Sequence, residues 1–310
     1  MRVLITGGAG FIGSHLAAAL SEDHAVTVLD DGSTGTPDRL PGAVSYVPGD
    51  IRDPDSLHDA IDDSTDCILH QAARVSVAHS IADPLDSHSV NTTGTLTVLE
   101  AARHHDTRVV LASSAAVYGA PQSLPIAESH PTTPTSPYGL EKLTADHYAR
   151  LYHELYDLET VALRYFNVYG PGQTGGDYAG VIAVFIEQAL AGEDITIHGD
   201  GEQTRDFVFV GDVVQANRAA ITTDQVGASY NIGTGESVSI RELAELIQAL
   251  TDTDADIVHT DPRAGDIAQS VADITNAQTH LHFRPRVSLR EGLERTVAWW
   301  QSDHMSTTHR

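Results

Sequence analysis

Short runs of apolar residues alternate along the first half of the chain with longer stretches whose apolar positions recur at helical spacing. A short continuous apolar run between turn residues is typical of a strand buried on both faces. The expected strands are Val3–Ile5, Ala25–Leu29, Val44–Val47, Cys67–Leu69, Arg108–Ala112 and Val161–Leu163. The expected helices include a segment ending near Leu20, Asp55–Ile61, Asn91–His104 and Pro137–Tyr156. Such alternation predicts an α/β fold with a doubly wound parallel sheet.

Polar or small residues follow several of these apolar runs directly. The strand-end segments are Asp30–Asp31, Gly49–Ile51, His70–Ala73, Ser113–Ser114 and Arg164–Asn167. Ligands of an open parallel sheet bind beyond the carboxyl ends of its strands. We therefore expect one ligand site along this edge of the sheet, where Asp50 and Ile51 are placed to meet an adenine.

The first strand runs into a turn that contains Gly7, Gly10 and Gly13 before a helix begins. At such a turn the glycines permit a tight bend, a close approach of backbone to a diphosphate, and packing of helix on strand. The helix N-terminus offers free N–H groups to the phosphates. The acids Asp30–Asp31 can bind an adenosine ribose and would repel a 2′-phosphate, and no arginine follows them until Arg39. This order predicts a dinucleotide site that favours NAD over NADP.

Lys142 is the only lysine among 310 residues, and it follows Tyr138 on a predicted helix. Ser136 can cap that helix, and Pro137 is tolerated at its first position. Residues i and i+4 of a helix share one face, so the ammonium is expected beside the phenol. An adjacent ammonium favours the phenolate, so we expect Lys142 to lower the pKa of Tyr138. A tyrosine with such a pKa can exchange a proton with a sugar or alcohol hydroxyl.

The chain changes character in its second half. Short segments with turns rich in glycine, such as 195–201 and 230–235, alternate there with helices. We expect residues 1–167 to form the dinucleotide-binding domain, with later segments returning to it. Residues 168–300 are expected to form mainly a smaller substrate-binding lobe, and the polar tail 301–310 is expected to be disordered.

Charge narrows the set of possible partners. The chain has 43 acidic residues against 18 lysines and arginines, which gives a formal net charge of −25. Such a field repels nucleic acid and anionic membranes, so neither is an expected partner. No apolar run approaches the ~18–20 residues of a membrane span, and the N-terminus does not have the pattern of a signal peptide. The acidic surface and the near absence of lysine favour a protein from a salty cytoplasm over an acidic mesophilic one.

The cysteine, the histidines and the residues around Ser114 do not indicate another kind of site. Cys67 is the only cysteine, which excludes an internal disulfide and is typical of a reducing cytoplasm. The nearest histidine pairs, His104–His105 and His280 with His282, lack further ligands at metal spacing, so no metal site is expected. Ser114 has no surrounding Gly-x-Ser-x-Gly motif, so it is not an expected acyl-transfer nucleophile.

Taken together, these motifs resemble the extended short-chain dehydrogenase/reductase family, specifically nucleotide-sugar epimerases of the UDP-glucose 4-epimerase type. The segments that carry the resemblance span nearly the whole chain and are 7–13, 113–119, 138–142, 163–167, 205–210, 262–266 and 287–293. The resemblance implies a Rossmann-type sheet with a smaller, interleaved C-terminal lobe. It also implies NAD as a resident cofactor, a UDP-sugar substrate, and a homodimer paired through helices 91–104 and 137–156.

The resemblance also assigns roles to residues of this chain. Tyr138 would be the acid/base at the sugar 4-hydroxyl, Lys142 would bond the nicotinamide ribose, and Ser114 would bond the same sugar oxygen as Tyr138. NAD would take the C4 hydride and return it to the opposite face of a 4-keto sugar. The implied cofactor residues are Gly7, Gly10, Phe11, Ile12, Gly13, Asp30, Asp31, Ser33, Gly35, Asp50, Ile51, Ala72, Ala73, Asn91, Tyr138 and Lys142. The implied substrate residues are Ser76, Ser114, Tyr138, Asn167, Arg205, Arg263, Asp266 and Ser270.

Three small residues refine the expected chemistry. Similar dehydratases carry Asp and Glu directly after the site serine or threonine, and similar decarboxylases carry a Glu nearby. Here those positions are Ala115 and Ala116, which cannot transfer a proton. In similar epimerases a bulky residue at the position of Ser270 excludes N-acetyl groups, so a serine there suggests that N-acetylhexosamines are accepted.

The sequence hypothesis is therefore NAD-dependent 4-epimerisation of a UDP-hexose. One alternative is another nucleotide-sugar epimerase or oxidoreductase of the same family, for example one acting on a UDP-uronic acid. An alternative from another class is a non-catalytic NAD-binding sensor, which would need the glycines and Asp30 but no proton-transfer residues. The natural sugar, the base and the pathway stay open at this point.

Overall fold

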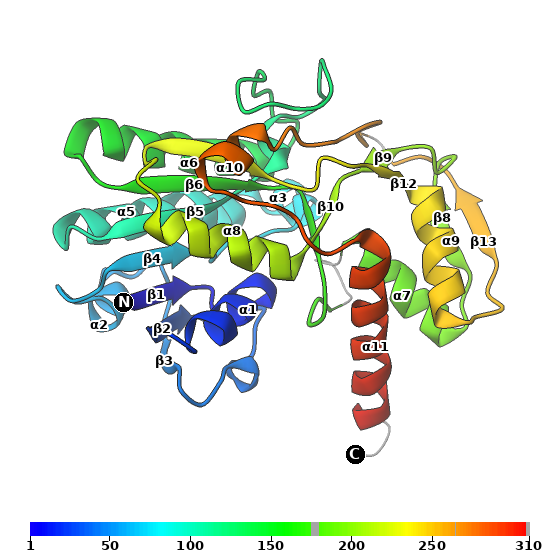
Figure 1. Ribbon diagram of the computed structural model, residues 1–310, viewed down its shortest axis with the longest axis horizontal. Helices are drawn as coiled ribbons and strands as arrows, with labels where there is room; N and C mark the ends of the chain where they lie inside the picture. The colour runs from blue at the N-terminus through cyan, green and yellow to red at the C-terminus, as the bar shows by residue number, and fades with distance from the viewer. Residues whose placement is uncertain (175–179, 264, 308–310) are drawn as a thin grey trace.

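The computed structural model describes residues 1–174, 180–263 and 265–307, and a seven-stranded parallel sheet forms the middle layer of its larger lobe, on the left in Figure 1. The strands lie in the order β11-β6-β5-β4-β1-β2-β3. They are β1 (Arg2–Thr6), β2 (Ala25–Asp30), β3 (Ser45–Pro48), β4 (Cys67–His70), β5 (Arg108–Ser114), β6 (Thr160–Tyr165) and β11 (Ala228–Ile232). The six strands expected from the apolar runs are all present, and the predicted doubly wound parallel sheet is confirmed.

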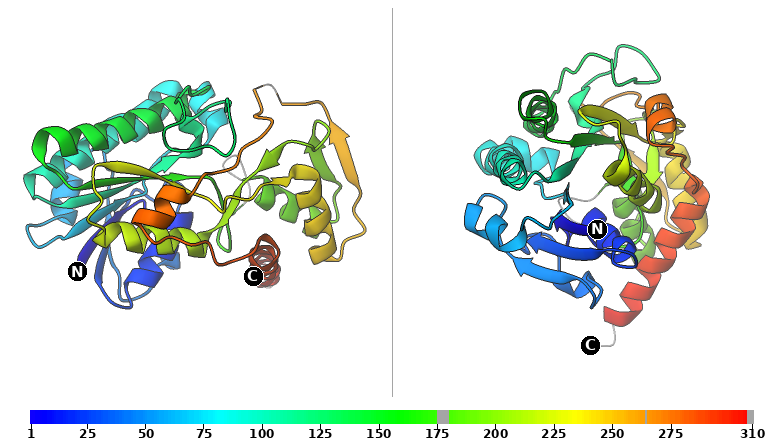
Figure 2. Two further views of the ribbon diagram at one scale, coloured as in Figure 1. Left: turned by 45° about the horizontal axis from the view of Figure 1, so that its top comes forward. Right: turned by 60° about the vertical axis from the view of Figure 1, so that its left-hand side comes forward.

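Helices cover both faces of this sheet (Figure 2). The elements on one face are α1 (Phe11–Leu20), α8 (Val210–Thr222) and α10 (Thr275–His280); those on the other are α2 (Pro54–Ala60), α5 (Thr95–His104) and α6 (Pro137–Tyr156). Successive strand residues point to opposite faces. In β1, Val3 and Ile5 belong to the core under α1 and α8, whereas Leu4 belongs to the core under α5 and α6.

The start of α6 follows from its first residues. Ser136 lies in an extended conformation, and its hydroxyl accepts a hydrogen bond from the N–H of Gly139 at 3.1 Å. Pro137 occupies the first helical position, where its missing N–H costs nothing. The helix ends at Tyr156, and the next residue, Asp157, has a left-handed backbone (φ 55°). The predicted helix Pro137–Tyr156 is therefore confirmed at both ends.

A short connected set of helices links the central strands to α5. It comprises α3 (Val77–Ala82), α4 (Pro84–His88) and a π-helical turn (Ser89–Gly94) that runs directly into α5. The predicted helix over 91–104 therefore begins two residues earlier, at Ser89, with its first turn wound as a π-helix. Two 3₁₀ turns, Pro37–Arg39 and Ala115–Val117, follow β2 and β5.

A smaller lobe lies beside the sheet and has its own core. Its elements are β7 (Asn167–Tyr169), α7 (Val181–Ala191), β8 (Ile195–His198), β9 (Thr204–Arg205), β10 (Phe207–Phe209), β12 (Val238–Ser239), α9 (Ile240–Thr251), β13 (Ile257–Thr260) and α11 (Leu289–Thr307). Phe185, Ile197, Leu243 and Trp300 are buried together in its core. Between these elements the chain returns to the large sheet through α8, β11 and α10.

The C-terminal helix differs from the sequence expectation. Leu293, Val297 and Trp300 are buried against the small lobe, and the helix continues to Thr307. The prediction of a disordered tail from residue 301 is therefore wrong as far as residue 307, and residues 308–310 lie outside the described residues. Once a helix is anchored, each added residue gains a backbone hydrogen bond without a new nucleation cost. Among the described helices, none is long and apolar enough to span a bilayer.

Candidate active site

A cavity of about 350 Å³ lies at the carboxyl ends of β1, β2, β4, β5 and β6. Fifteen of the predicted catalytic and cofactor residues line it, namely Gly7, Gly10, Phe11, Ile12, Gly13, Asp30, Asp31, Ser33, Asp50, Ile51, Ala72, Ala73, Ser114, Tyr138 and Lys142. The topology thus joins positions that are more than a hundred residues apart in the sequence. Gly35 and Asn91, which the resemblance also assigned to the cofactor, are not part of this lining.

The glycine turn forms the floor of the cavity. Gly7 has a left-handed backbone (φ 68°), and a Cβ there would lie 2.6 Å from the Cα of Ala72. A Cβ on Gly13 would lie 2.2 Å from the carbonyl oxygen of Gly7. The N-cap of α1 is Gly10, which has no side chain to cover the first N–H groups of the helix. The turn therefore presents bare backbone to the cavity, as a diphosphate requires.

The two acids after β2 have different environments. The carboxylate of Asp30 is buried and accepts hydrogen bonds from Ala9 N (2.9 Å) and Gly32 N (2.8 Å). Burial raises the pKa of Asp30 despite these two bonds. Asp31 is exposed, and its Oδ1 accepts hydrogen bonds from the N–H (2.9 Å) and the hydroxyl (2.6 Å) of Ser33. Asp30 therefore also fixes the glycine turn, whereas Asp31 is the less constrained of the two.

Ser114, Tyr138 and Lys142 meet at the other end of the cavity. Ser114 lies at the end of β5, and its hydroxyl forms a hydrogen bond with Tyr138 and another with Ala116 N at 3.2 Å. The Tyr138 N–H donates to Ser80 Oγ at 3.1 Å, which positions the first turn of α6. Lys142 is buried, and its Nζ donates to the carbonyl oxygen of Ala112 at 2.9 Å. One serine, one phenol and one ammonium thus line a common space.

The prediction that the pKa of Tyr138 is lowered is wrong for this structure. Burial raises the pKa of Tyr138; the hydrogen bond with Ser114 acts in the opposite direction, and the charge of Glu141 raises it further. Burial also lowers the pKa of Lys142, to about 8, although the Glu141 carboxylate acts to raise it. Desolvation therefore outweighs the attraction that i, i+4 spacing suggests, and at neutral pH the pair is a phenol beside an ammonium.

Asn91 lies behind the cavity wall rather than in it. It is buried, its Oδ1 accepts from Arg74 N at 2.8 Å, and its Nδ2 donates to Arg74 O at 2.9 Å. The same Nδ2 donates to Glu141 Oε2 at 2.7 Å, and Ser87 Oγ donates to that oxygen at 2.7 Å. Its polar atoms are therefore bonded to protein. Asn91 holds the loop after β4 against α6 and acts on the cavity through Arg74.

A family model, the NAD dependent epimerase/dehydratase family, matches residues 3–233 of the chain. The chain belongs to this family. The match covers the glycine turn, Ser114, Tyr138 and Lys142, which are the residues that the fold brings to the cavity.

Relatives and solved structures match nearly the whole chain. A putative UDP-glucose 4-epimerase from Methanocaldococcus jannaschii is 39% identical over 305 residues, covering 97% of this chain and 99% of the relative. The crystal structure of UDP-glucose 4-epimerase from Thermotoga maritima with UDP-glucose has a TM-score of 0.94 at 35% identity, covering 98% of this chain and 100% of that one. UDP-N-acetylglucosamine 4-epimerase from Methanobrevibacter ruminantium has a TM-score of 0.93 at 38% identity, covering 97% and 98%. The Rossmann-type fold is thus shared with epimerases.

The residues present fit the NAD of this family. Bare backbone at the glycine turn suits the diphosphate, and Asp31 suits the adenosine ribose. The ammonium of Lys142 and the phenol of Tyr138 lie where β5 and α6 border the cavity, at the end away from the adenosine side. Within the described residues, no group of three His, Cys, Asp or Glu side chains is placed to hold a metal ion.

Two predicted substrate residues line a second cavity, in the small lobe. Arg263 and Asp266 border this space of about 700 Å³ together with His198, Arg241 and His259. The guanidinium of Arg205 forms an ion pair with Asp266 from the strand β9, so it lies at the edge of the same region. An arginine pair with an adjacent acid is suited to a nucleoside diphosphate, since guanidinium groups bind phosphate and a carboxylate binds ribose hydroxyls.

Three other predicted substrate residues line neither of these cavities. The Asn167 amide donates to Asp206 O at 3.0 Å, and Ser76 caps α3 by accepting from His79 N at 3.1 Å. The Ser270 N–H donates to the carbonyl oxygen that precedes Arg205, at 3.1 Å, so Ser270 lies directly beside β9. The roles proposed for Asn167, Ser76 and Ser270 at a sugar therefore stay predictions.

Sequence reasoning missed two arginines of the first cavity. Arg39 lines the cavity and donates to Gly172 O at 3.0 Å. Arg74 lines it from the loop after β4, directly behind the predicted Ala72 and Ala73. The strand-end rule could have found Arg74, since the rule applies to the whole loop. Arg39 could not have been found, because its partner loop is distant in sequence.

The lowered pKa of Lys142 predicts a pH limit on turnover. Below pH 8 the amine is charged and can bond a ribose hydroxyl as a cation, and above that pH the charge is lost, so we expect kcat for epimerisation to fall as pH rises through about 8. The neighbouring His70 cannot produce this limb, because burial lowers its pKa to about 3. Replacing Glu141 by glutamine should move the limb to lower pH, since the carboxylate favours the ammonium. A kcat that stays level well above pH 8 would contradict this assignment.

Proposed function

We propose that the protein catalyses the NAD-dependent 4-epimerisation of a UDP-hexose, interconverting UDP-glucose and UDP-galactose. The observation that carries this proposal is that Ser114, Tyr138 and Lys142 line the same cavity as the glycine turn of residues 7–13. A dinucleotide and a set of proton-transfer groups thus share one space. A non-catalytic sensor would need the first of these features but has no use for the second.

The residues of the chain divide the work in the following way. When bound, NAD supplies reversible hydride acceptance at the sugar C4. Tyr138 removes the proton of the 4-hydroxyl and later returns it, and Ser114 donates a hydrogen bond to the same oxygen as its charge changes. Lys142 orients the nicotinamide ribose, with its ammonium held by Ala112 O. Tyr138 begins as a phenol of raised pKa, so it must lose its own proton before it can act as the base, and the hydrogen bond with Ser114 lowers its pKa toward that state.

The nucleotide is held in the small lobe in this proposal. Arg205 and Arg263 bind the diphosphate, and Asp266 binds the nucleoside ribose at the edge of the second cavity. The ion pair between Arg205 and Asp266 has side-chain exposures of 16% and 34%, so its arginine is largely desolvated before a ligand arrives. A desolvated guanidinium binds an anion more strongly than one in water, because little hydration is lost on binding.

Ala115 and Ala116 favour epimerisation over the other chemistry of the family. Both lie in the 3₁₀ turn that follows Ser114, and both are partly buried. The resemblance places the acid and base of dehydratases here, and a methyl group can neither donate nor accept a proton. Removal of water from C5–C6 therefore has no catalyst, while epimerisation requires only Tyr138 and its neighbours. The lack of an acid or base at Ala115 and Ala116 also disfavours decarboxylation of a uronic acid.

Acceptance of N-acetylhexosamines forms a finer part of the proposal. Ser270 is small, and the related Methanobrevibacter enzyme is named as a UDP-N-acetylglucosamine 4-epimerase. We propose that a serine at this position leaves room for the acetamido group at C2. Replacing Ser270 by tyrosine should then abolish turnover of UDP-N-acetylglucosamine and spare that of UDP-glucose. Equal loss for both substrates would show that the position does not discriminate between them.

The deciding experiment is an assay of the purified protein with four substrates. UDP-glucose, UDP-N-acetylglucosamine, UDP-glucuronic acid and dTDP-glucose should each be incubated without added oxidant, and the products separated by stereochemistry. Epimerisation predicts an equilibrium mixture of C4 epimers with no accumulation of free NADH. Release of carbon dioxide, loss of water or net NADH formation would instead assign the chain to another reaction of the family, and dTDP-glucose turnover would assign it to another base.

The assembly that we propose is a homodimer. Large apolar side chains are exposed on α6 and on the adjacent α3 and α4, namely Ile81, Leu85, Leu140, Leu151, Leu155 and Tyr156. Leu85 is 82% exposed and Leu155 is 67% exposed, which is costly for leucine in water. Pairing of α5 and α6 with those of a second copy would cover part of this surface. Sedimentation of the purified protein at twice the monomer mass of 33.1 kDa would support it, and a monomer at all concentrations would oppose it.

The charge and cysteine content support two further proposals about the setting. A net charge of −25 with a single lysine fits a salty cytoplasm, where screening reduces self-repulsion. Cys67 is buried and free, as is common for a protein of a reducing compartment. Unfolding in urea at rising KCl concentration tests the first of these proposals. A free energy of unfolding that does not increase with KCl would refute it.

A further inference from the structure

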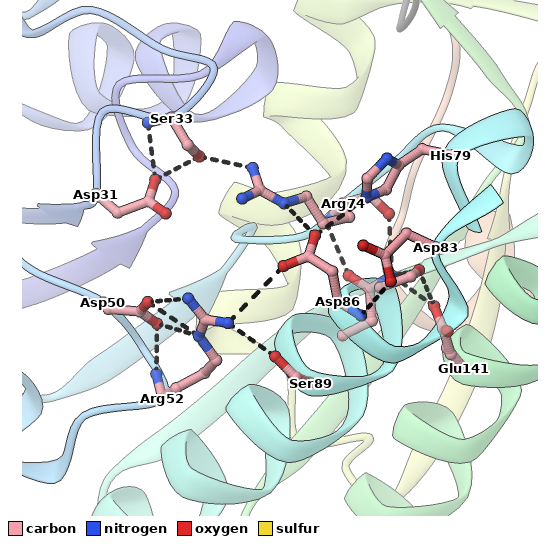
Figure 3. Close-up of polar contacts among 12 residues, drawn as sticks. Asp31, Ser33, Asp50, Arg52, Arg74, His79, Asp83, Asp86, Ser89 and Glu141 are labelled. Carbon is pink, nitrogen blue, oxygen red and sulfur yellow. Dashed lines mark hydrogen bonds and ion pairs between the residues drawn. The ribbon is translucent and has the colours of Figure 1, made fainter.

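Arg74 occupies an unusual place above the cofactor cavity. Its main chain is fixed, because both its N–H and its carbonyl oxygen are bonded to the side chain of Asn91. Its side chain then extends away from this anchor, and Nη1 donates to Ser33 Oγ at 2.8 Å. On the other side its Nε donates to Asp86 Oδ2 of α4 at 3.3 Å. Figure 3 shows this guanidinium between Ser33 and Asp86.

We call the contact from Ser33 through Arg74 to Asp86 the bridge. The order of the strands determines where the bridge lies. In the sheet β1 lies between β4 and β2. Arg74 belongs to the loop after β4, and Ser33 belongs to the loop after β2, so a bond between them passes over the end of β1. The glycine turn of residues 7–13 follows β1 directly and forms the floor of the same cavity. A dinucleotide bound along that turn would therefore lie beneath the bridge.

The residues at the two ends of this contact have further partners. Asp86 also accepts from His79 Nε2 at 3.0 Å, and Arg52 lies 4.0 Å from its other oxygen. The Ser33 hydroxyl donates in turn to Asp31 Oδ1. The Arg74 side chain is only 19% exposed, so its charge-assisted bonds are stronger than those of a surface arginine. A series of hydrogen bonds thus runs from α4 to the adenosine side of the cavity, through Asp86, Arg74, Ser33 and Asp31 in turn.

We propose that Arg74 is a cofactor-retaining residue, which closes the adenosine side of the NAD site by joining Ser33 to Asp86. The inference deepens the proposed function, since an epimerase regenerates its cofactor in every turnover and gains nothing from exchanging it. A dehydrogenase, by contrast, must release reduced cofactor. NAD can leave only when the bond between Arg74 and Ser33 opens, so that bond slows dissociation.

The test measures NAD release from holoenzyme at fixed salt concentration. Wild-type protein, Arg74→Gln and Arg74→Lys are each loaded with NAD and diluted, and the NAD that remains bound after rapid gel filtration is quantified over time. Arg74→Gln should release NAD at least about tenfold faster, the loss expected for one charge-assisted hydrogen bond. Arg74→Lys should lie between the two, because an ammonium keeps the charge but cannot bridge two partners with a planar fork.

Two matched variants separate the bridge from its surroundings. His79→Gln removes another partner of Asp86 that does not reach Ser33, so its release rate should equal that of wild type. Ser33→Ala removes the far anchor and leaves Arg74 in place, so it should release NAD faster and covers the case in which Arg74 variants fail to fold. The proposal would be overturned if Arg74→Gln or Arg74→Lys retained NAD as long as wild-type protein does. It would also be overturned if His79→Gln released NAD as fast as Arg74→Gln. Wild-type protein that holds NAD but does not epimerise UDP-hexoses would refute the proposed function alone.

Discussion

Replacing Tyr138 by phenylalanine is expected to lower kcat for epimerisation roughly 10²- to 10⁴-fold, the range for loss of a general acid–base group. The change removes one oxygen and keeps the ring. The bond from the Tyr138 N–H to Ser80 that positions the first turn of α6 also stays, so the cavity should keep its shape. Bound NAD should therefore be retained while turnover is lost. Steady-state rates with UDP-glucose and the NAD content of the purified variant measure the two effects separately.

The control for this variant lies on the same helix. Tyr148 of α6 packs at the edge of the core under α5 and does not line the cavity. Its replacement by phenylalanine removes the same atom from the same element, so kcat should stay at the wild-type value. If Tyr138→Phe and Tyr148→Phe behaved alike, the assignment of Tyr138 as the proton-transfer group would be wrong. Loss of NAD from the Tyr138 variant would show that the hydroxyl also holds the cofactor, and the fall in kcat would then not report proton transfer alone.

Replacing Asp146 by alanine is expected to lower the free energy of unfolding by about 3–5 kcal/mol, the cost of breaking a buried ion pair. Asp146 and Arg164 have side-chain exposures of only 5% and 8%. The carboxylate accepts from Arg164 Nε (2.8 Å) and Nη2 (3.2 Å), from Ser113 Oγ (3.0 Å) and from Ser229 Oγ (2.7 Å). Its removal leaves the Arg164 guanidinium charged inside the protein with its main partner gone.

The ion pair between Arg218 and Asp23 provides the matched control. These side chains are 39% and 60% exposed, and the nitrogen and oxygen lie 2.8 Å apart, as close as in the buried pair. Because water competes for both charges, Asp23→Ala should cost at most about 1 kcal/mol. Urea unfolding of both variants at one NAD concentration gives the comparison, since bound cofactor stabilises the folded state by mass action. Similar losses of unfolding free energy in the two variants would show that burial does not determine how much these ion pairs stabilise the protein.

The buried pair also bears on catalysis. Asp146 lies one turn beyond Lys142 on α6, and its bonds to Ser113, Arg164 and Ser229 fasten that helix to β5, β6 and β11. Ser113 immediately precedes Ser114. The relative positions of Ser114, Tyr138 and Lys142 therefore depend on a residue that does not enter the cavity. A fall in kcat of the Asp146 variant under conditions where it is fully folded would reflect this positioning.

Several features of this protein depend on neighbours in sequence, and the sequence determined them. The helix that carries Tyr138 and Lys142 begins at Pro137 because the cap Ser136 and the proline act within one turn. The glycine turn leads from a strand into a helix because Gly7 has a left-handed backbone (φ 68°) and because a Cβ on Gly13 would collide with the carbonyl oxygen of Gly7 in the same segment. The parallel sheet follows from the alternation of apolar runs and helices. These causes act between residues that are close in the sequence, so the pattern of residues along the chain can reveal them.

Only the tertiary structure decided the rest. It buried Tyr138 and so raised a pKa that the spacing to Lys142 had suggested would fall. The fold bonds Asn91 to Arg74, so Asn91 is not exposed to the cavity. The fold also places β1 between β4 and β2, which brings Arg74 over the glycine turn. Desolvation and contact between distant loops depend on which elements lie side by side in three dimensions. No residue pattern within one segment contains that information, because the neighbours that set it come from elsewhere in the chain.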